Sequence, residues 1–193
     1  FLQHDLHAIE MRLWELLQNS VSSFKSPFHT GVVATVHEQQ PELRTVVLRH
    51  ADAQQKKLFF HTDIRSPKVN QLQKHPQMSW LFYDKDIRMQ LRLTAAAIVH
   101  LDDGVADKAW EESRLSNRLT YTTSSAAGTI LSTPELIDLN QKEVEAELID
   151  IAWKNFCVVE TTVQQMDWTF LHYSGNRRAL FQYNSKQFQW VQV

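Results

Sequence analysis

Residues 57–68 read K-L-F-F-H-T-D-I-R-S-P-K, a run that passes from a strand into the start of a helix. The segment from Lys57 to Thr62 is rich in apolar and aromatic residues, which favours a strand. Ser66 is a good helix N-cap and Pro67 suits the first helical position, so we predict a short helix that ends near Lys74. The sequence therefore predicts a change from strand to helix within this run.

Strand-like segments continue on both sides of this run. Short runs rich in Val, Leu, Ile and Phe, separated by polar turns, predict strands at Thr30–His37, Leu43–Arg49, Met78–Tyr83, Ile87–His100, Phe156–Val163, Trp168–Tyr173, Ala179–Tyr183 and Phe188–Val193. Apolar residues at helical spacing predict helices over residues 5–19, with Asp5 as cap, over Asp102–Leu115 and over Gln141–Asn155. Roughly seven to nine short strands with few helices between them favour a mainly β fold, an antiparallel barrel decorated by several helices, in a single domain over residues 1–193.

The composition excludes several functional classes. The chain has 193 residues, and its 20 Lys and Arg against 22 Asp and Glu give a net charge of -2. That balance argues against a nucleic-acid partner, because nucleic-acid-binding domains are usually strongly basic. The four glycines are at least 24 positions apart, so neither the G-x-G-x-x-G nor the G-x-x-x-x-G-K-[ST] phosphate loop occurs. A bound phosphate would have to be held by side chains and a helix end.

Cysteine content and hydropathy give further exclusions. The single cysteine, Cys157, excludes a disulfide within the chain and every multi-cysteine zinc site, and its apolar neighbours favour a buried residue. His4 and His7 lie one helical turn apart without a third ligand nearby, so an exposed helix face is favoured over a metal pair. No apolar stretch approaches the ~18 residues that span a membrane, and no secretory signal is visible. We therefore expect a cytoplasmic protein with no membrane partner.

The predicted helix start has the composition of an anion site. Arg65 lies just before the helix and Lys68 in its first turn, at the positive end of the helix dipole, where each cation costs about 0.3–1 kcal/mol. A bound anion would reverse this cost, and the hydroxyls of Thr62 and Ser66 add hydrogen-bond donors. These residues describe a phosphate site. The alternative is a solvated loop in which salt screens the two cations.

Two other segments place arginines in alternating patterns. In R-T-V-V-L-R, residues 44–49, alternation puts Arg44 on one face with two aliphatic residues. Such an arginine is either part of an amphipathic edge or a partly buried cation that needs a partner. In R-M-Q-L-R, residues 88–92, Gln90 shares a face with two arginines. That pattern fits a plain polar face, or an amide presented to a polar ring edge.

The order of these motifs resembles the FMN-binding family of pyridoxamine 5′-phosphate oxidase. The motifs are R-T-V-V-L-R, L-F-F-H-T-D-I-R-S-P-K, W-L-F-Y-D and R-M-Q-L-R-L, and they cover about residues 28–121, with a further match at 168–181. The resemblance implies an antiparallel split β-barrel of the FMN-binding type. It also implies a homodimer, with FMN held between the two subunits and a small-molecule substrate beside it.

The resemblance assigns roles to residues of this chain. It implies that FMN is bound by Arg44, Val46, Val47, Arg49, His61, Thr62, Arg65, Ser66, Lys68, Gln90, Trp168 and Arg178. Within this set, Arg44, Ser66 and Lys68 match positions that bind the flavin phosphate, and Arg65 stands in for an arginine that Pro67 replaces. Gln90 matches the position that hydrogen-bonds the isoalloxazine edge, whereas Trp168 and Arg178 match positions that reach the flavin from the partner subunit. Substrate-binding positions fall at Arg49, Trp110, Arg114 and Arg118.

We therefore expect an FMN-dependent oxidoreductase related to pyridoxamine 5′-phosphate oxidase, with an unassigned substrate and no metal. The alternative is a non-catalytic protein that holds flavin or haem for storage or sensing on the same barrel. Flavin absorption that bleaches with a reduced donor favours the enzyme, and a Soret band favours haem.

Overall fold

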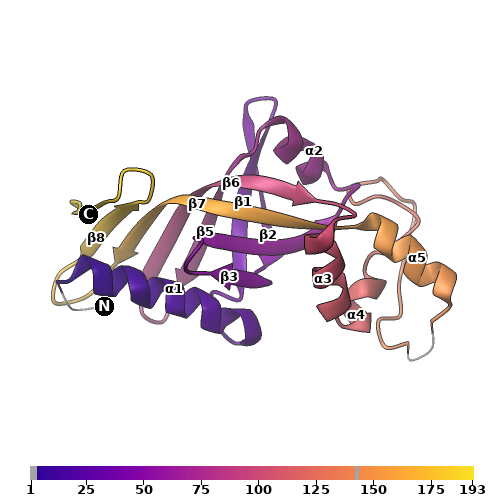
Figure 1. The fold of residues 1–193 in the computed structure, drawn as a ribbon, viewed down its shortest axis with the longest axis horizontal. Coiled ribbons are helices and arrows are strands. Elements are labelled where there is room, and N and C mark those ends of the chain that lie inside the picture. The colour runs from indigo at the N-terminus through magenta and orange to yellow at the C-terminus, as the bar shows by residue number, and fades with distance from the viewer. Residues whose placement is uncertain (1–3, 142–143) are drawn as a thin grey trace.

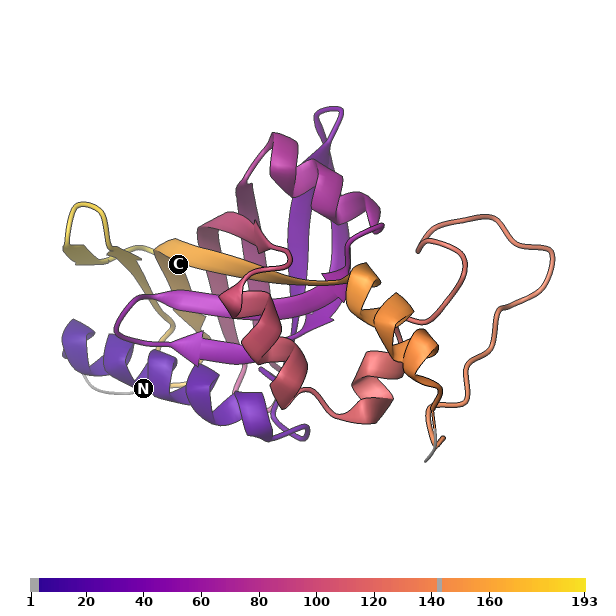
Figure 2. The ribbon, with the colours of Figure 1, turned by 45° about the vertical axis from the view of Figure 1, so that its right-hand side comes forward.

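One antiparallel sheet of nine strands runs through residues 4–141 and 144–193, the part of the chain that the computed structural model describes (Figure 1). The strands are β1 Thr30–His37, β2 Gln40–Val47, β3 His50–Asp52, β4 Lys57–Asp63, β5 Gln77–Asp84, β6 Met89–His100, β7 Phe156–Phe170, β8 Arg177–Gln182 and β9 Gln187–Trp190. Their order is β2-β1-β5-β6-β7-β4-β3, with β8 paired to β7 and β9 to β8. The two ends of this order cross at a steep angle without closing, as Figure 2 shows. The predicted antiparallel split barrel is confirmed.

The sheet divides along β7. One edge of β7 pairs with β6 along its length, while the other edge pairs first with β4, over residues 156–162, and then with β8, over residues 165–170. Where the partner changes, the Val163 N–H donates to the Lys56 carbonyl and the Gln164 carbonyl accepts from the Tyr183 N–H. The sequence predicts two separate strands here, and that prediction is wrong. The polar residues between them lie in one continuous strand because both partners supply backbone hydrogen bonds.

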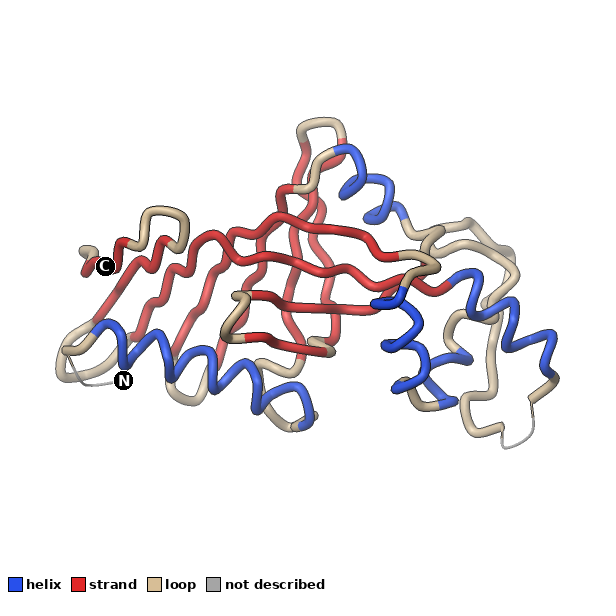
Figure 3. Tube along the Cα trace, in the orientation of Figure 1, coloured by secondary structure: helices blue, strands red, loops and turns tan. Residues whose placement is uncertain are grey.

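Five helices lie outside the sheet in the described part of the chain (Figure 3): α1 Leu6–Ser22, α2 Pro67–Lys74, α3 Gly104–Glu112, α4 Leu115–Leu119 and α5 Ala146–Asn155. α1 begins as predicted after Asp5, whose carboxylate accepts hydrogen bonds from the N–H groups of His7 and Ala8. α3, α4 and α5 gather at one end of the molecule, where α5 leads directly into β7 (Figure 1). None of the helices in these residues is long and apolar enough to cross a membrane.

Two predicted helices differ from those observed. The helix predicted over Asp102–Leu115 is shorter in the structure, where α3 ends at Glu112 because Ser113 and Arg114 both adopt extended backbone geometry. A separate helix, α4, begins at Leu115. The helix predicted over Gln141–Asn155 begins at Ala146, and residues 142–143 of that prediction lie outside the described residues. These changes leave the sheet order intact and concern only the helices at the end of β7.

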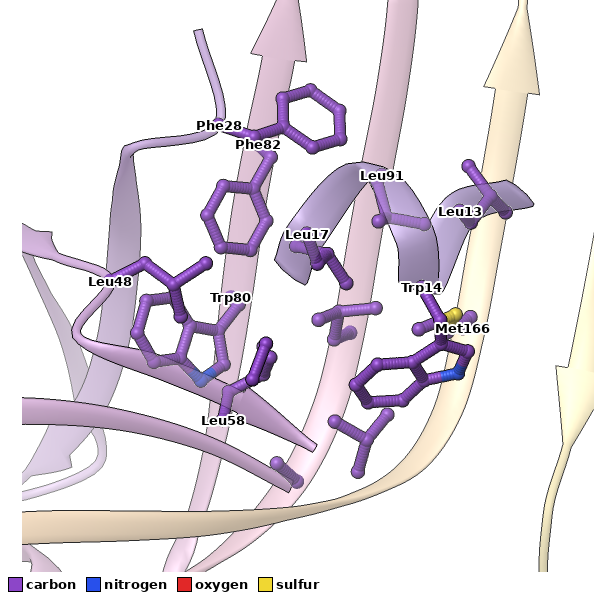
Figure 4. Packing of buried hydrophobic residues seen from close by; sticks show 14 of the residues in the cluster. Leu13, Trp14, Leu17, Phe28, Leu48, Leu58, Trp80, Phe82, Leu91 and Met166 are labelled. Atoms are coloured by element: carbon purple, nitrogen blue, oxygen red, sulfur yellow. The ribbon is translucent and has the colours of Figure 1, made fainter. Parts of the chain in front are cut away.

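The core lies between α1 and the sheet. Figure 4 shows residues of α1 packed against residues of the strands and the loops beside them: Leu13, Trp14, Leu17, Phe28, Leu48, Leu58, Trp80, Phe82, Leu91 and Met166. The Trp14 indole N–H donates to the Tyr183 hydroxyl at 2.8 Å, and that hydroxyl donates to the buried Glu10 carboxylate at 2.8 Å. Glu10 also accepts from Lys56 at 2.9 Å. This network joins α1 to the chain after β8.

Candidate functional site

The start of α2 brings together a lysine and two hydroxyl groups. Lys68 Nζ donates hydrogen bonds to Thr62 Oγ1 at 2.9 Å and to Ser66 Oγ at 2.5 Å. Both hydroxyls belong to buried residues, and burial of the ammonium, together with the charge of nearby Arg44, lowers the pKa of Lys68. None of the ion pairs within residues 4–141 and 144–193 involves Lys68. Three of the four residues that the sequence grouped as an anion site, Thr62, Ser66 and Lys68, therefore lie in contact.

Arg44 of β2 lies beside this group, but a carboxylate already holds it. Its guanidinium donates to Thr35 Oγ1 at 2.5 Å and to the Glu42 carboxylate at 3.1 Å. Gln71 of α2 donates to the same carboxylate at 2.9 Å, and this hydrogen bond is the main cause that lowers the pKa of Glu42. Burial lowers the pKa of Arg44, which Glu42 partly offsets. Sequence reasoning missed Glu42, although it stands two positions before Arg44, on the same face of the strand.

Arg65 points to a different partner. Its guanidinium donates to Asp63 Oδ2 at 2.6 Å and to the Thr123 carbonyl at 3.0 Å. The hydrogen bond to Asp63 raises the pKa of Arg65. The structure thus uses Arg65 to fasten the loop after α4 to the end of β4, and does not bring it into contact with the hydroxyls of Thr62 and Ser66.

Arg49, just after β2, lies near His61 of β4: the Arg49 N–H donates to the Phe59 carbonyl of the same strand. Burial lowers the pKa of His61 to about 4, and the charge of Arg49 acts in the same direction. The His61 ring packs edge-on against Phe156 at 5.0 Å between centroids. Burial raises the pKa of Tyr121 to about 12, with the Arg49 charge opposing it. Tyr121, which the sequence did not single out, therefore belongs to this neighbourhood. Val46 and Val47 are partly buried at the end of β2, and Val46 packs against the core.

The predicted substrate residues beyond Arg49 lie on α3 and α4. The Trp110 ring contacts Phe156 at 5.2 Å, and the Arg118 guanidinium lies 5.0 Å above the Trp110 ring. Arg118 also donates to the carbonyls of Trp110 at 3.0 Å and Glu111 at 2.9 Å, which satisfies groups at the end of α3. Arg114 is exposed just before α4. Of these residues, Arg114 is the one left accessible, whereas Arg118 stabilises the junction of the two helices.

Gln90, Arg92 and Arg178 form a second group on one face of the sheet, at the other end of β6 and β7, whereas Trp168 points to the opposite face, into the core. Thr169 is the cross-strand partner of both Gln90 and Arg178, and the neighbouring Trp168 is buried and stacked on Phe170. The Arg178 guanidinium donates to Asp167 at 3.0 and 2.9 Å, and Arg92 donates to the same carboxylate. Arg92 and Asp167 line an open cavity of about 320 Å³ on this face of the sheet. The sequence pattern pointed to neither Asp167 nor its pairing.

The two groups are far apart within one chain. Thr62 pairs with Cys157 at the start of β7, whereas Gln90 pairs with Thr169 near its end. The 12 positions between these β7 residues correspond to roughly 40 Å of extended strand. Figure 1 shows β7 crossing the molecule from α5 to β8. A single chain therefore does not bring both groups to one small ligand.

Two weaker candidates have structural explanations. The Cys157 thiol donates to the Thr62 carbonyl at 3.4 Å, and burial raises its pKa to about 12, so it is a poor nucleophile. The His4 ring contacts Trp190 and the His7 ring contacts Phe188, which places both histidines against β9. Within residues 4–141 and 144–193, no three His, Cys, Asp or Glu side chains gather as metal ligands.

Comparison with known proteins shows clear relatives. A family described as pyridoxamine 5′-phosphate oxidase, FMN-binding domain, matches residues 11–101. The pyridoxine/pyridoxamine 5′-phosphate oxidase of Klebsiella pneumoniae is 31% identical over 198 residues, covering 95% of this chain and 85% of that protein. A solved structure of a pyridoxamine 5′-phosphate oxidase-related FMN-binding protein from Nostoc punctiforme superimposes with a TM-score of 0.71 at 20% identity, over 95% of this chain and 96% of that one. PhzG from Burkholderia lata, solved with tetrahydrophenazine-1-carboxylic acid, gives 0.71 at 16% identity, over 100% and 97%.

Proposed function

Because this chain belongs to the FMN-binding pyridoxamine 5′-phosphate oxidase family, we propose that it is an FMN-dependent oxidoreductase whose cofactor lies between two identical subunits. One observation carries the proposal: the Lys68 ammonium meets two hydroxyls at the start of α2 and, within the described residues, forms no ion pair. A phosphate at this position would accept hydrogen bonds from Lys68, Ser66 and Thr62. Its negative charge would also be stabilised by the positive end of the α2 helix dipole. These residues fit the terminal phosphate of FMN.

The separation of the two groups supports a site shared by two chains. One subunit would hold the phosphate through Lys68 and its hydroxyl partners. Gln90 of the partner subunit would donate its amide to the isoalloxazine edge, and Arg178 of the partner subunit would lie beside it. An isologous dimer would then hold two equivalent sites, each with one group from either chain.

The substrate would bind on the side of the flavin that faces α3 and α4. FMN, when bound, supplies the hydride acceptor of the reaction. Arg49 and the exposed Arg114 are the cations available to an anionic group of a small substrate, because Arg118 is engaged at the end of α3. His61, with a pKa of about 4, would be neutral at pH 7 and would present an uncharged imidazole there.

The engagement of Arg118 and Trp110 with each other favours one rival function. If these residues only join α3 to α4, the protein could retain FMN without turning over a phosphorylated substrate, as a storage or sensing protein does. Anaerobic addition of NAD(P)H or another reduced donor distinguishes the two functions. Bleaching of the flavin absorption supports the oxidoreductase, and a stable spectrum with every donor supports the binding protein.

The identity of the cofactor is the first prediction. Purified protein should be yellow, and heat should release FMN alone, because the Lys68 cluster suits one terminal phosphate and the chain has no glycine-rich loop for a second. Chromatography of the released flavin against FMN, FAD and riboflavin standards makes the measurement. FAD as the sole flavin, or a colourless protein whose melting temperature FMN does not raise, would contradict the proposal.

A further inference from the structure

A single buried carboxylate joins two arginines in the second group. Asp167, which is 6% exposed, accepts two hydrogen bonds from Arg178 and one from Arg92. The three residues lie on the adjacent strands β8, β7 and β6, and Arg92 is the cross-strand partner of Asp167. Although burial alone would raise it, hydrogen bonds from Arg178 and Arg92 hold the pKa of Asp167 below its ordinary value. The carboxylate is therefore ionised at neutral pH.

This arrangement leaves one surplus positive charge and several unused donors. Arg178 contacts Asp167 through Nε and Nη2, and Arg92 through Nη2. No other hydrogen bond within the described residues uses the side chain of either arginine. Both side chains are partly exposed, at 50% for Arg92 and 30% for Arg178, and Arg92 and Asp167 line the cavity of about 320 Å³. Asp167 thus fixes one edge of each guanidinium and leaves the rest accessible.

Another buried carboxylate of this chain has a different role. Glu10, also 6% exposed, joins one lysine and one tyrosine hydroxyl and ties α1 to the chain after β8. Glu10 thus has a structural role with a single cationic partner. Asp167 instead holds two arginines on the sheet face that, by strand alternation, also carries Gln90.

We propose that Asp167 is a positioning residue, which orients Arg92 and Arg178 so that their remaining N–H groups donate across the subunit interface to the carbonyl-bearing edge of the flavin. The inference rests on the proposed function, because it requires a flavin between two subunits. The planar guanidinium suits this task, since one edge is fixed by the carboxylate while its other N–H groups stay in a defined direction.

The reduction potential of the bound flavin separates positioning from simple charge balance. Reduction places negative charge on the carbonyl-bearing edge of the ring, so nearby cations raise the potential. If Asp167 orients the arginines, its loss frees them to turn into solvent, and the potential falls. If Asp167 only balances their charge, its loss leaves the arginines in place with one more net positive charge, and the potential rises.

The test compares Asp167→Asn with Glu10→Gln, which removes an equally buried carboxylate at another place. We expect Asp167→Asn to weaken both riboflavin and FMN about tenfold and to lower the flavin potential, as befits lost charge-assisted hydrogen bonds. Glu10→Gln should leave the flavin affinities and the flavin reduction potential near the wild-type values, even if it lowers the melting temperature. In the Arg178→Ala background, Asp167→Asn should add little further loss of riboflavin affinity, because the aspartate acts through the arginines.

The outcomes separate this inference from the proposed function. Wild-type protein that binds neither flavin overturns both. Wild-type protein that binds FMN, with an unchanged or raised potential in Asp167→Asn, overturns the positioning role alone. If Asp167→Asn does not fold, Arg178→Lys decides, because lysine keeps the charge but loses the two-point contact with Asp167. Riboflavin affinity within about threefold of wild type in Arg178→Lys would overturn the inference.

Discussion

At the scale of single residues, the two cations beside α2 differ in what holds them. Lys68 donates to two hydroxyls, so a phosphate would join its present partners. Arg44 donates to the Glu42 carboxylate, so a phosphate would have to share or replace that partner. The sequence predicted that both cations bind phosphate but missed this difference, although Glu42 stands two positions before Arg44 on the same face of the strand.

Truncation of Lys68 should separate phosphate binding from ring binding. Lys68→Ala or Arg44→Ala should weaken FMN by roughly ten- to hundredfold and leave riboflavin nearly unchanged, because charge-assisted hydrogen bonds to the phosphate are lost. Gln90→Ala should weaken both ligands by a similar and smaller factor, since both carry the same ring. Titration of each variant with both flavins provides the measurement, with the exposed Lys85→Ala as control. Equal losses of FMN and riboflavin in Lys68→Ala would show that the start of α2 does not hold the phosphate.

The partly buried His61 should make the stability of the flavin-free protein depend on pH. Its pKa is about 4 in the folded chain and about 6.5 when exposed, so between these values only the unfolded chain binds the proton. The contribution of His61 to the free energy of unfolding should therefore be fully present above pH 6.5. It should fall by about 1–3 kcal/mol as the pH drops to 4, and the partial exposure of the ring reduces the effect. Urea unfolding of His61→Gln should show a flatter profile over this range than the exposed-site variant His50→Gln. Parallel profiles for the two variants would contradict the lowered pKa of His61 in the folded protein.

At the scale of elements, β1 depends on a glycine for its approach to β5. A Cβ atom on Gly31 would lie 2.6 Å from the Phe82 ring and 2.9 Å from the Trp80 ring, and these two rings are themselves stacked. Gly31→Ala should destabilise the protein by about 1–3 kcal/mol through overpacking. Gly104→Ala is the matched control, because nothing lies within 4 Å of its Cβ position. Urea unfolding measures both, and equal stability of the two variants would count against this packing.

The elements that sequence patterns predicted well are those with local signals. α1 and α2 begin at their predicted caps, Asp5 and Ser66, and β1 has its predicted bounds. β7 was predicted as two strands because its apolar pattern is interrupted near Gln164, and only pairing with β4 and then β8 keeps that stretch extended. The residue types of the candidate site were likewise visible in the sequence. The resemblance already placed Trp168 and Arg178 on the partner subunit, but it did not place Gln90 at the same end of β7, because that position follows from strand register between segments far apart in the chain.

At the scale of the whole molecule, the proposed sharing of each site by two subunits predicts how mixed dimers would behave. Lys68→Ala removes a residue that would bind the phosphate of FMN, and Arg178→Ala removes one that would lie beside the flavin ring. Each homodimer of either variant would therefore have two defective sites. In a mixed dimer, one site carries both changes and the other carries neither. After random exchange of subunits, about a quarter of all sites should regain wild-type FMN affinity. Titration of the re-equilibrated mixture makes the measurement, with each variant mixed with itself as control. No recovery would mean that both groups serve the same chain or that subunits do not pair in this way.

The continuity of β7 has a consequence for the geometry of such a dimer. One strand begins beside Thr62, which contacts Lys68, and ends beside Gln90 and Arg178. In the proposed dimer, the length of this strand would therefore set the distance between the two flavins. A deletion of one residue within β7 would turn every following side chain to the opposite face of the sheet. A deletion of two residues would shorten the strand by roughly 7 Å and leave each side chain on its present face. Loops of this chain can change length without altering that distance. In the proposed dimer, the length of this single strand would therefore determine the spacing between the two redox centres.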